Sequence, residues 1–229
     1  MRLLAIDTST EACSAALLLG EEPRLRIEMT ERSHAELILP MVDSLLAEAG
    51  LALGDLDGLA FGRGPGAFTG LRIAAGVVQG LALGSGLPVV GISSLAAVAE
   101  QVPAAVGEEI LVCNDARMKE IYWGLYRRLD HGIDCLGHER VSAPEALEFD
   151  PAGVRHATGN AIDRYDGLRS MLETASLRIH DNLYPRADAV ARLASIEFQA
   201  GRTGGPADAL PVYVRDSVAR PPARRVTGM

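Results

Sequence analysis

The sequence is poor in several residue types, and each shortage argues against a class of protein. Only three of the 229 residues are cysteine, and none forms a Cys-x-x-Cys pair. This disfavours a disulfide framework or a cysteine zinc site and favours reduced thiols. The longest apolar run, residues 71–83, is shorter than the roughly 18 residues of a membrane helix. With no signal-peptide pattern at the N-terminus, we expect a cytoplasmic protein without a membrane partner.

Positive charge is also scarce. Lys119 is the only lysine, and the formal net charge is −8. A protein that binds nucleic acid on its own should carry a basic patch, so this balance argues against that role. Arginines make the last fifteen residues locally basic, a pattern typical of a solvated terminus. They are Arg215, Arg220, Arg224 and Arg225.

Recognisable catalytic patterns are missing as well. The five histidines form no His-x-x-x-His or His-Glu-x-x-His pair, which argues against a histidine metal site. There is no Gly-x-Ser-x-Gly elbow, and no cysteine has the surroundings of a nucleophile. We therefore predict no catalytic residues and no metal site.

The first half of the chain alternates strand and helix patterns. Apolar runs at 3–6, 13–19, 24–29, 56–61 and 88–92 predict strands. Residues 33–50 predict a helix in which Ser33 and Glu36 form a capping box and Pro40 introduces a kink. A further helix is expected at 94–101.

The apolar segment 71–83 predicts another helix with an unusual stripe. Gly76, Gly80 and Gly84 recur every fourth residue and therefore share one helical face. Each glycine costs roughly 1 kcal/mol relative to alanine inside a helix. Such a cost is compensated where another helix approaches closely. The second helix could belong to a partner, or the stripe could pack on this protein's own sheet, and both interpretations stay open.

The second half repeats the opening pattern. A strand at 110–113, a polar turn at 114–117 and a strand at 120–126 echo residues 3–19 at an offset of 108. A repeat of that length predicts two homologous α/β halves, divided as 1–103 and 104–229. Further strands are expected at 154–158 and 177–179, with helices at 144–147, 165–172 and 187–199. The last helix or the tail is expected to pack back on the first half.

Two loops have the composition of phosphate sites. Residues 62–67 match the dinucleotide pattern Gly-x-Gly-x-x-Ala, but Pro65 removes a backbone donor and the next acid is Glu100. Dinucleotide binding is therefore disfavoured. Asp7, Thr8 and Ser9 follow the first strand, where hydroxyls and a carboxylate suit a phosphate and a hydrated magnesium ion.

Several segments resemble the bacterial TsaB (YeaZ) family. The resemblance covers nearly the whole chain, and its most specific part is Gly-Pro-Gly-Ala-Phe-Thr-Gly-Leu-Arg at 64–72. The other matching segments are 3–9, 34–40, 62–63, 114–117, 120–123 and 210–215.

The resemblance implies an α/β actin-like ATPase (ribonuclease H-like) fold with two duplicated lobes, each a mixed sheet flanked by helices. It implies a non-catalytic activator of the TsaD threonylcarbamoyltransferase, which forms N6-threonylcarbamoyladenosine at position 37 of tRNAs. The His-x-x-x-His metal motif of TsaD is missing from this sequence. A TsaE-type ATPase would join the complex, the isolated protein would form a homodimer, and tRNA would be bound only through the complex.

The resemblance also assigns residues. Asp7, Thr8 and Ser9 stand where the superfamily holds phosphates, which implies at most weak ATP or ADP binding with magnesium at a vestigial site. The family contact would use the helices at 33–50 and 69–84. Its expected interface residues are Leu37, Met41, Leu45, Arg72, Gly76, Val77 and Gly80.

Two enzyme alternatives share this fold. A peptidase would need a nucleophile or a metal site, and a small-molecule kinase would need further phosphate loops. The sequence shows neither, and both alternatives can be tested by activity.

Overall fold

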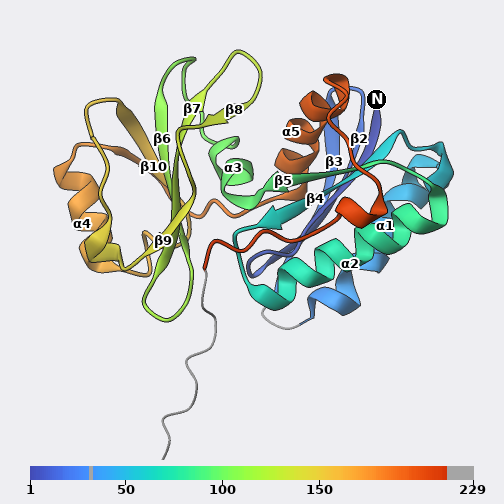
Figure 1. Cartoon of the computed structure of the whole chain (residues 1–229), viewed down its shortest axis with the longest axis horizontal. Helices are drawn as coiled ribbons and strands as arrows, with labels where there is room; N and C mark the ends of the chain where they lie inside the picture. Colours follow the sequence, from blue (N-terminus) through green and yellow to red (C-terminus); the bar gives the residue numbers. More distant parts are fainter. Residues whose placement is uncertain (31–32, 216–229) are drawn as a thin grey trace, which may run out of the picture.

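The protein is described from a computed structural model that covers residues 1–30 and 33–215. Of the basic tail expected from the sequence, Arg220, Arg224 and Arg225 lie outside these residues. Within the described ranges, no helix combines the length and apolar character needed to cross a membrane. Figure 1 shows two β-sheets side by side with helices on their faces.

The first sheet is built from the first half of the chain. The hairpin of β1 and β2 is antiparallel, and β4 and β5 add in parallel on the other side of β1. Most of β1 and β2 is buried, as expected for strands covered on both faces. The strand order is β3 (Glu22–Met29), β2 (Ala12–Leu19), β1 (Arg2–Asp7), β4 (Gly58–Gly64), β5 (Val89–Ser93).

The second sheet repeats this order. The antiparallel hairpin of β6 and β7 corresponds to β1 and β2, and β10 and β11 add in parallel on the far side of β6. The predicted duplicated α/β fold is thereby confirmed. The order is β8 (Ile133–Cys135), β7 (Ile121–Arg128), β6 (Glu109–Asp115), β10 (Val154–Thr158), β11 (Arg178–His180), and β9 (Arg140–Ser142) also pairs with β7. The predicted division at residue 103 falls between the sheets and stays a prediction.

Two long helices cover one face of the first sheet. They are α1 (His34–Ala49) and α2 (Phe68–Ser85), and the short turn η1 (Leu53–Asp55) follows α1. Because side chains alternate along a strand, Leu4 and Ile6 of β1 face these helices. Leu3 and Ala5 face the other side, where they pack with α5 (Ala187–Gln199). A helix from the second half of the sequence therefore completes the core of the first sheet.

The helices of the second sheet are shorter. The helix α3 (Ser94–Ala99) packs against this sheet through Leu95 and Val98, although it follows β5 of the first sheet. Its other outer elements are α4 (Asp166–Thr174) and the 3-10 turn η2 (Pro144–Ala146). The helix expected at 144–147 is therefore a single 3-10 turn in the structure. It also adds β8 and β9, which were too short to give a sequence pattern.

The predicted start of α1 is partly wrong. Ser33 occupies the N-cap position, but its side chain makes no capping hydrogen bond, so the expected capping box with Glu36 does not form. The Ser33 backbone carbonyl instead accepts from the amides of Glu36 and Leu37. Pro40 lies inside the helix, which continues to Ala49 and ends at Gly50 in the left-handed conformation.

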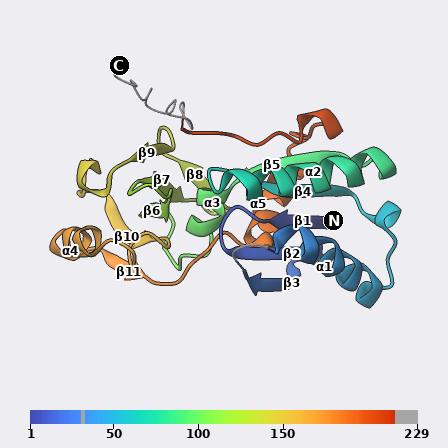
Figure 2. The same ribbon diagram turned by 90° about the horizontal axis from the view of Figure 1, so that it is seen from below.

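The end of the described chain crosses from one sheet to the other. We call residues 203–215 the strap. It pairs with the first sheet between Gly204 and Val89, forms the turn η3 (Pro206–Asp208), and its Val212 amide donates to the Arg63 carbonyl. Figure 2 shows the strap in red, passing beside α2 toward the second sheet.

Candidate functional site

The turn after β1 is built from polar side chains that bond to one another. The Asp7 carboxylate is fully buried, and its Oδ1 accepts from the backbone amide and the hydroxyl of Ser9 at 2.8 and 2.7 Å. Its Oδ2 accepts from the Ser94 hydroxyl at 3.3 Å. Burial raises the pKa of the Asp7 carboxyl, and the bonds from Ser9 and Ser94 oppose that rise. The Thr8 hydroxyl donates to the Gly70 carbonyl at 2.7 Å.

The glycine-rich loop closes over this turn. A Cβ on Gly62 would lie 1.8 Å from the Asp7 carboxylate, and one on Gly66 would lie 2.5 Å from the Ser9 carbonyl oxygen. A Cβ on Gly70 would lie 1.9 Å from the Thr8 carbonyl oxygen. These glycines therefore allow contact between two parts of the same chain, and Gly62, the first glycine of the Gly-x-Gly-x-x-Ala pattern, is one of them.

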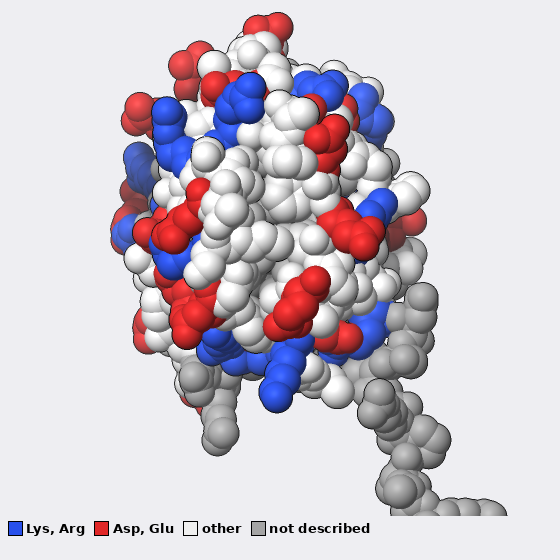
Figure 3. Space-filling view, turned by 90° about the vertical axis from the view of Figure 1, so that its left-hand side faces the viewer, with Lys and Arg blue, Asp and Glu red and all other residues white. Residues whose placement is uncertain are grey.

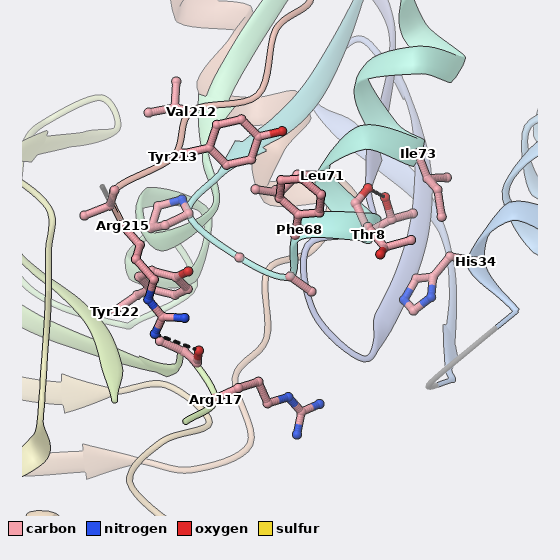
Figure 4. Close-up of a pocket in the computed structure, with 17 residues that line it drawn as sticks. Thr8, His34, Phe68, Leu71, Ile73, Arg117, Tyr122, Val212, Tyr213 and Arg215 are labelled. Atoms are coloured by element: carbon pink, nitrogen blue, oxygen red, sulfur yellow. Dashed lines mark hydrogen bonds between the residues drawn. The ribbon is translucent and has the colours of Figure 1, made fainter. Parts of the chain in front are cut away.

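We call the turn at residues 7–9 the closed turn. A pocket of about 400 Å³ lies beside it, between the two sheets. Phe68 and Leu71 come from α2, Tyr122 from β7 of the second sheet, and Tyr213 and Arg215 from the strap. Figure 4 shows these side chains facing the same space, with Arg117 at its lower edge and His34 on the side of α1. The pocket combines aromatic walls with arginines and is lined by both halves of the chain.

Polar side chains of the loops at 114–117 and 158–160 form ion pairs and hydrogen bonds with other residues of the chain. Asp115 pairs with Arg164 and Arg117 and accepts a hydrogen bond from Tyr165. Asn160 accepts from the Asp115 amide through Oδ1 and donates to the Glu11 carboxylate at 3.3 Å. This last bond joins the two halves of the chain.

The outer face of α2 carries the glycine stripe. A Cβ placed on Gly76, Gly80 or Gly84 would meet no atom within 4 Å, so the stripe faces open space. The helix packs on its own sheet through other residues, among them Ala74, Ala75 and Val78. The interpretation in which the stripe packs on the protein's own sheet is therefore wrong.

The expected interface residues divide into three groups. Arg72, Gly76 and Gly80 are exposed, whereas Leu37, Met41 and Val77 are half-buried and pack partly against the core. Leu45 is fully buried among the core residues of the first sheet, so its expected place at the interface needs correction. Periodicity groups residues on a helix but does not say which group faces inward.

The strap makes contacts that the sequence did not predict. Its Tyr213 ring lies 5.4 Å from the Phe68 ring, and its hydroxyl accepts from Arg72 Nε at 3.0 Å. Arg215 bonds to the Ala116 carbonyl and pairs with Glu120 of the second half. The only sequence signal was the segment 210–215, which matched the family pattern without indicating a role.

Three of the five histidines make polar contacts within the chain. His34 Nε2 lies 2.7 Å from the Thr10 carbonyl oxygen, and His156 Nδ1 lies 2.9 Å from His180 Nε2. Within residues 1–30 and 33–215, no group of three or more His, Cys, Asp or Glu side chains is arranged to hold a metal ion.

Comparisons with known proteins agree with one another. A family described as TsaD, tRNA N6-adenosine threonylcarbamoyltransferase, matches residues 27–182. The chain is 38% identical to the tRNA threonylcarbamoyladenosine biosynthesis protein TsaB of Escherichia coli, over 96% of each chain. Identity to the protein of that name from Haemophilus influenzae is also 38%, over 95% of each. The solved structure of YeaZ from Pseudomonas aeruginosa superposes with a TM-score of 0.81 at 39% identity, covering 93% of this chain and 99% of that one.

Proposed function

This chain belongs to the TsaB family of tRNA threonylcarbamoyladenosine biosynthesis proteins, and we propose that it is the non-catalytic partner and activator of a TsaD-type threonylcarbamoyltransferase. In this role it would support formation of N6-threonylcarbamoyladenosine on tRNA without reacting with the substrate itself. A TsaE-type ATPase would join the complex in the cytoplasm. The isolated protein would form a homodimer, and tRNA would be bound only through the complex.

The observation that carries the proposal is the outward glycine stripe of α2. Glycine at three exposed helical positions costs roughly 1 kcal/mol each relative to alanine, and no packing within the described chain compensates that cost. Close approach by a helix of another subunit would compensate that cost. Two helices from each subunit would then form a four-helix arrangement.

The closed turn supports a non-catalytic role. The Asp7 carboxylate accepts three hydrogen bonds from its own chain, and the loop at 62–70 packs directly on the turn. A phosphate or a hydrated magnesium ion would need the same oxygens and the same space. We therefore propose that Asp7, Thr8 and Ser9 are a vestigial phosphate site and that any ATP or ADP binding is weak.

A tRNA-modification assay tests the proposal. Purified TsaD-type and TsaE-type proteins, threonylcarbamoyl-adenylate and tRNA are combined with and without this protein. We expect modification only when all three proteins are present, and none from this protein alone. Unchanged modification on adding it would contradict the activator role.

The same preparation tests the enzyme alternatives. A related protein of Pseudomonas aeruginosa is described as similar to the peptidase YeaZ, so peptide hydrolysis is a fair control. Hydrolysis by the pure protein, or ATP-dependent phosphorylation of a metabolite, would favour an enzyme over an activator.

A further inference from the structure

Arg72 is held in one orientation on the outer surface of α2. Its guanidinium carbon lies 3.9 Å from the centre of the Phe68 ring, one helical turn earlier. Its Nε donates to the Tyr213 hydroxyl at 3.0 Å, and the Tyr213 ring contacts Phe68 at 5.4 Å. Phe68 and Tyr213 are each 43% exposed, so the group lies at the surface rather than in the core.

The strap fixes the tyrosine that holds this arginine. On one side of Tyr213, the Val212 amide donates to the Arg63 carbonyl at 2.7 Å. On the other side, Arg215 is bonded to the Ala116 carbonyl and the Glu120 carboxylate of the second half. Tyr213 is therefore fixed between two anchored neighbours, and its hydroxyl is set in position for Arg72.

The outer edge of the guanidinium is left unused. Across residues 1–30 and 33–215, Arg72 forms no ion pair, and its only hydrogen bond is the one from Nε. Nη1 and Nη2 therefore have no hydrogen-bond partner among these residues, and their donors are free for a ligand. A guanidinium edge with two parallel donors matches a carboxylate, and ordering it before binding lowers the entropic cost of the complex.

We propose that Arg72 is a preorganised anchor for a carboxylate of the TsaD-type partner, and that the strap belongs to the partner interface because Tyr213 holds Arg72. The inference rests on the proposed function and adds the chemistry of the contact.

The surroundings favour a protein carboxylate over an RNA phosphate. Arg72 lies one turn before Gly76, where the open stripe lets a second helix approach. Phe68 and Leu83 expose apolar surface at the two ends of the same helix. On α1, the exposed charged residues include Glu36 and Asp43, so the helix pair lacks the row of cations that a phosphate backbone binds. Arginine stacked on an aromatic ring beside apolar surface is typical of binding hot spots between proteins.

Calorimetric titration of the full-length protein with the purified TsaD-type partner tests the anchor. We expect Arg72→Ala to weaken binding about 30-fold or more, as for a hot-spot residue. Arg72→Lys should weaken it nearly as much, because an ammonium group has neither the paired donors nor the flat stacking face. Tyr213→Phe, which removes only the hydroxyl, should weaken binding about 3- to 10-fold. Circular dichroism melting checks that each variant is folded.

Arg155→Ala is the matched control. Arg155 is exposed on the second sheet, and among the residues that the structure describes its guanidinium bonds only to the backbone carbonyls of Ala152 and Val154. Its replacement should leave partner affinity unchanged.

Three results would distinguish the possibilities. If the wild-type protein does not bind the partner, the proposed function fails. If the wild type binds and Arg72→Ala or Arg72→Lys binds equally well, the anchor is wrong while the proposed function stands. If Arg72→Ala leaves partner affinity intact but weakens tRNA binding by the assembled complex, the arginine contacts RNA and the anchor is again wrong.

Discussion

The two sheets have the same strand order but very different outer helices. On the first sheet, α1 has 16 residues and α2 has 18. At the corresponding places on the second sheet, η2 has 3 residues and α4 has 9. Since the second sheet folds with so little helix, the length of α1 and α2 exceeds what the fold requires. The difference favours the proposed partner contact on the outer face of the first sheet.

The chemistry of these outer faces differs in the same way. On α4, Arg169 pairs with Asp163 and Asp181, and Figure 3 shows positive and negative side chains interspersed over the end of the molecule formed by the second sheet. On α2, the only charged side chain is Arg72. Exposed ion pairs contribute roughly 0–1 kcal/mol each and suit a surface that stays in water. The face of α2 suits contact with another protein.

The strongest test places the same charge on both faces. Gly76 of α2 and Gly167 of α4 both face open space, so a side chain fits at either position. We expect Gly76→Glu to weaken binding of the TsaD-type partner about 100-fold or more, because it would put a carboxylate between two closely packed helices. Calorimetric titration measures this loss.

Gly167→Glu is the control for that substitution. It adds the same charge to the second sheet's helix and should leave partner affinity within about 2-fold, since surface substitutions away from a contact have small effects. Equal losses from the two variants would contradict the assignment of the interface to the first sheet.

The next test concerns stability at the closed turn. Gly70 lies in the first turn of α2, and its added Cβ would lie 1.9 Å from the Thr8 carbonyl oxygen. We expect Gly70→Ala to lower the free energy of unfolding by about 3 kcal/mol, because the backbone on both sides has to move. Urea denaturation measures the change. Gly84→Ala in the same helix meets nothing within 4 Å and should not destabilise the protein.

The sequence predicted most of this architecture because it is carried by local patterns. The helix at 187–199 was predicted with its observed bounds, and the duplicated hairpins were found from their apolar runs and polar turns. The contacts of the strap were not predictable, because Tyr213 meets Arg72 across 141 residues. The closed turn was missed for the same reason. Gly62 begins a Gly-x-Gly-x-x-Ala pattern that is typical of a ligand loop, and only the fold shows that Gly62, Gly66 and Gly70 contact the chain itself.

The two sheets should also respond to pH in opposite directions. Desolvation and the neighbouring His156 hold the pKa of His180 below its usual 6.5. The unfolded chain then binds the proton more readily, so the stability from His180 is present above pH 6.5 and is lost as the pH falls below it. Burial raises the pKa of Asp7 above 3.8, so its stabilising contribution is present below that pH and is lost as the pH rises through the folded-state pKa.

Urea denaturation between pH 4 and 8 separates the two contributions. His180→Gln should reduce the loss of stability below pH 6.5, and Asp7→Asn should reduce the loss that occurs as the pH rises from 4. Each variant serves as the control for the other. A His180→Gln variant with the wild-type profile below pH 6.5 would contradict the assignment of that loss to the second sheet.

The smallest expected effect gives the most direct comparison, because it changes stability and binding in opposite directions. Gly80 faces open space on α2, so Gly80→Ala should raise the free energy of unfolding by up to about 1 kcal/mol through helix propensity alone. Gly167→Ala on α4 should raise the free energy of unfolding similarly, since a Cβ added there also meets no atom within 4 Å.

The two variants should differ in partner binding. The methyl group that Gly80→Ala adds would occupy space that a second helix needs and should weaken binding about 3- to 10-fold. The methyl group that Gly167→Ala adds should not weaken binding. Urea denaturation and calorimetric titration on the same samples give both quantities. Stabilisation by Gly80→Ala with unchanged affinity would mean that the glycine stripe lies outside the interface.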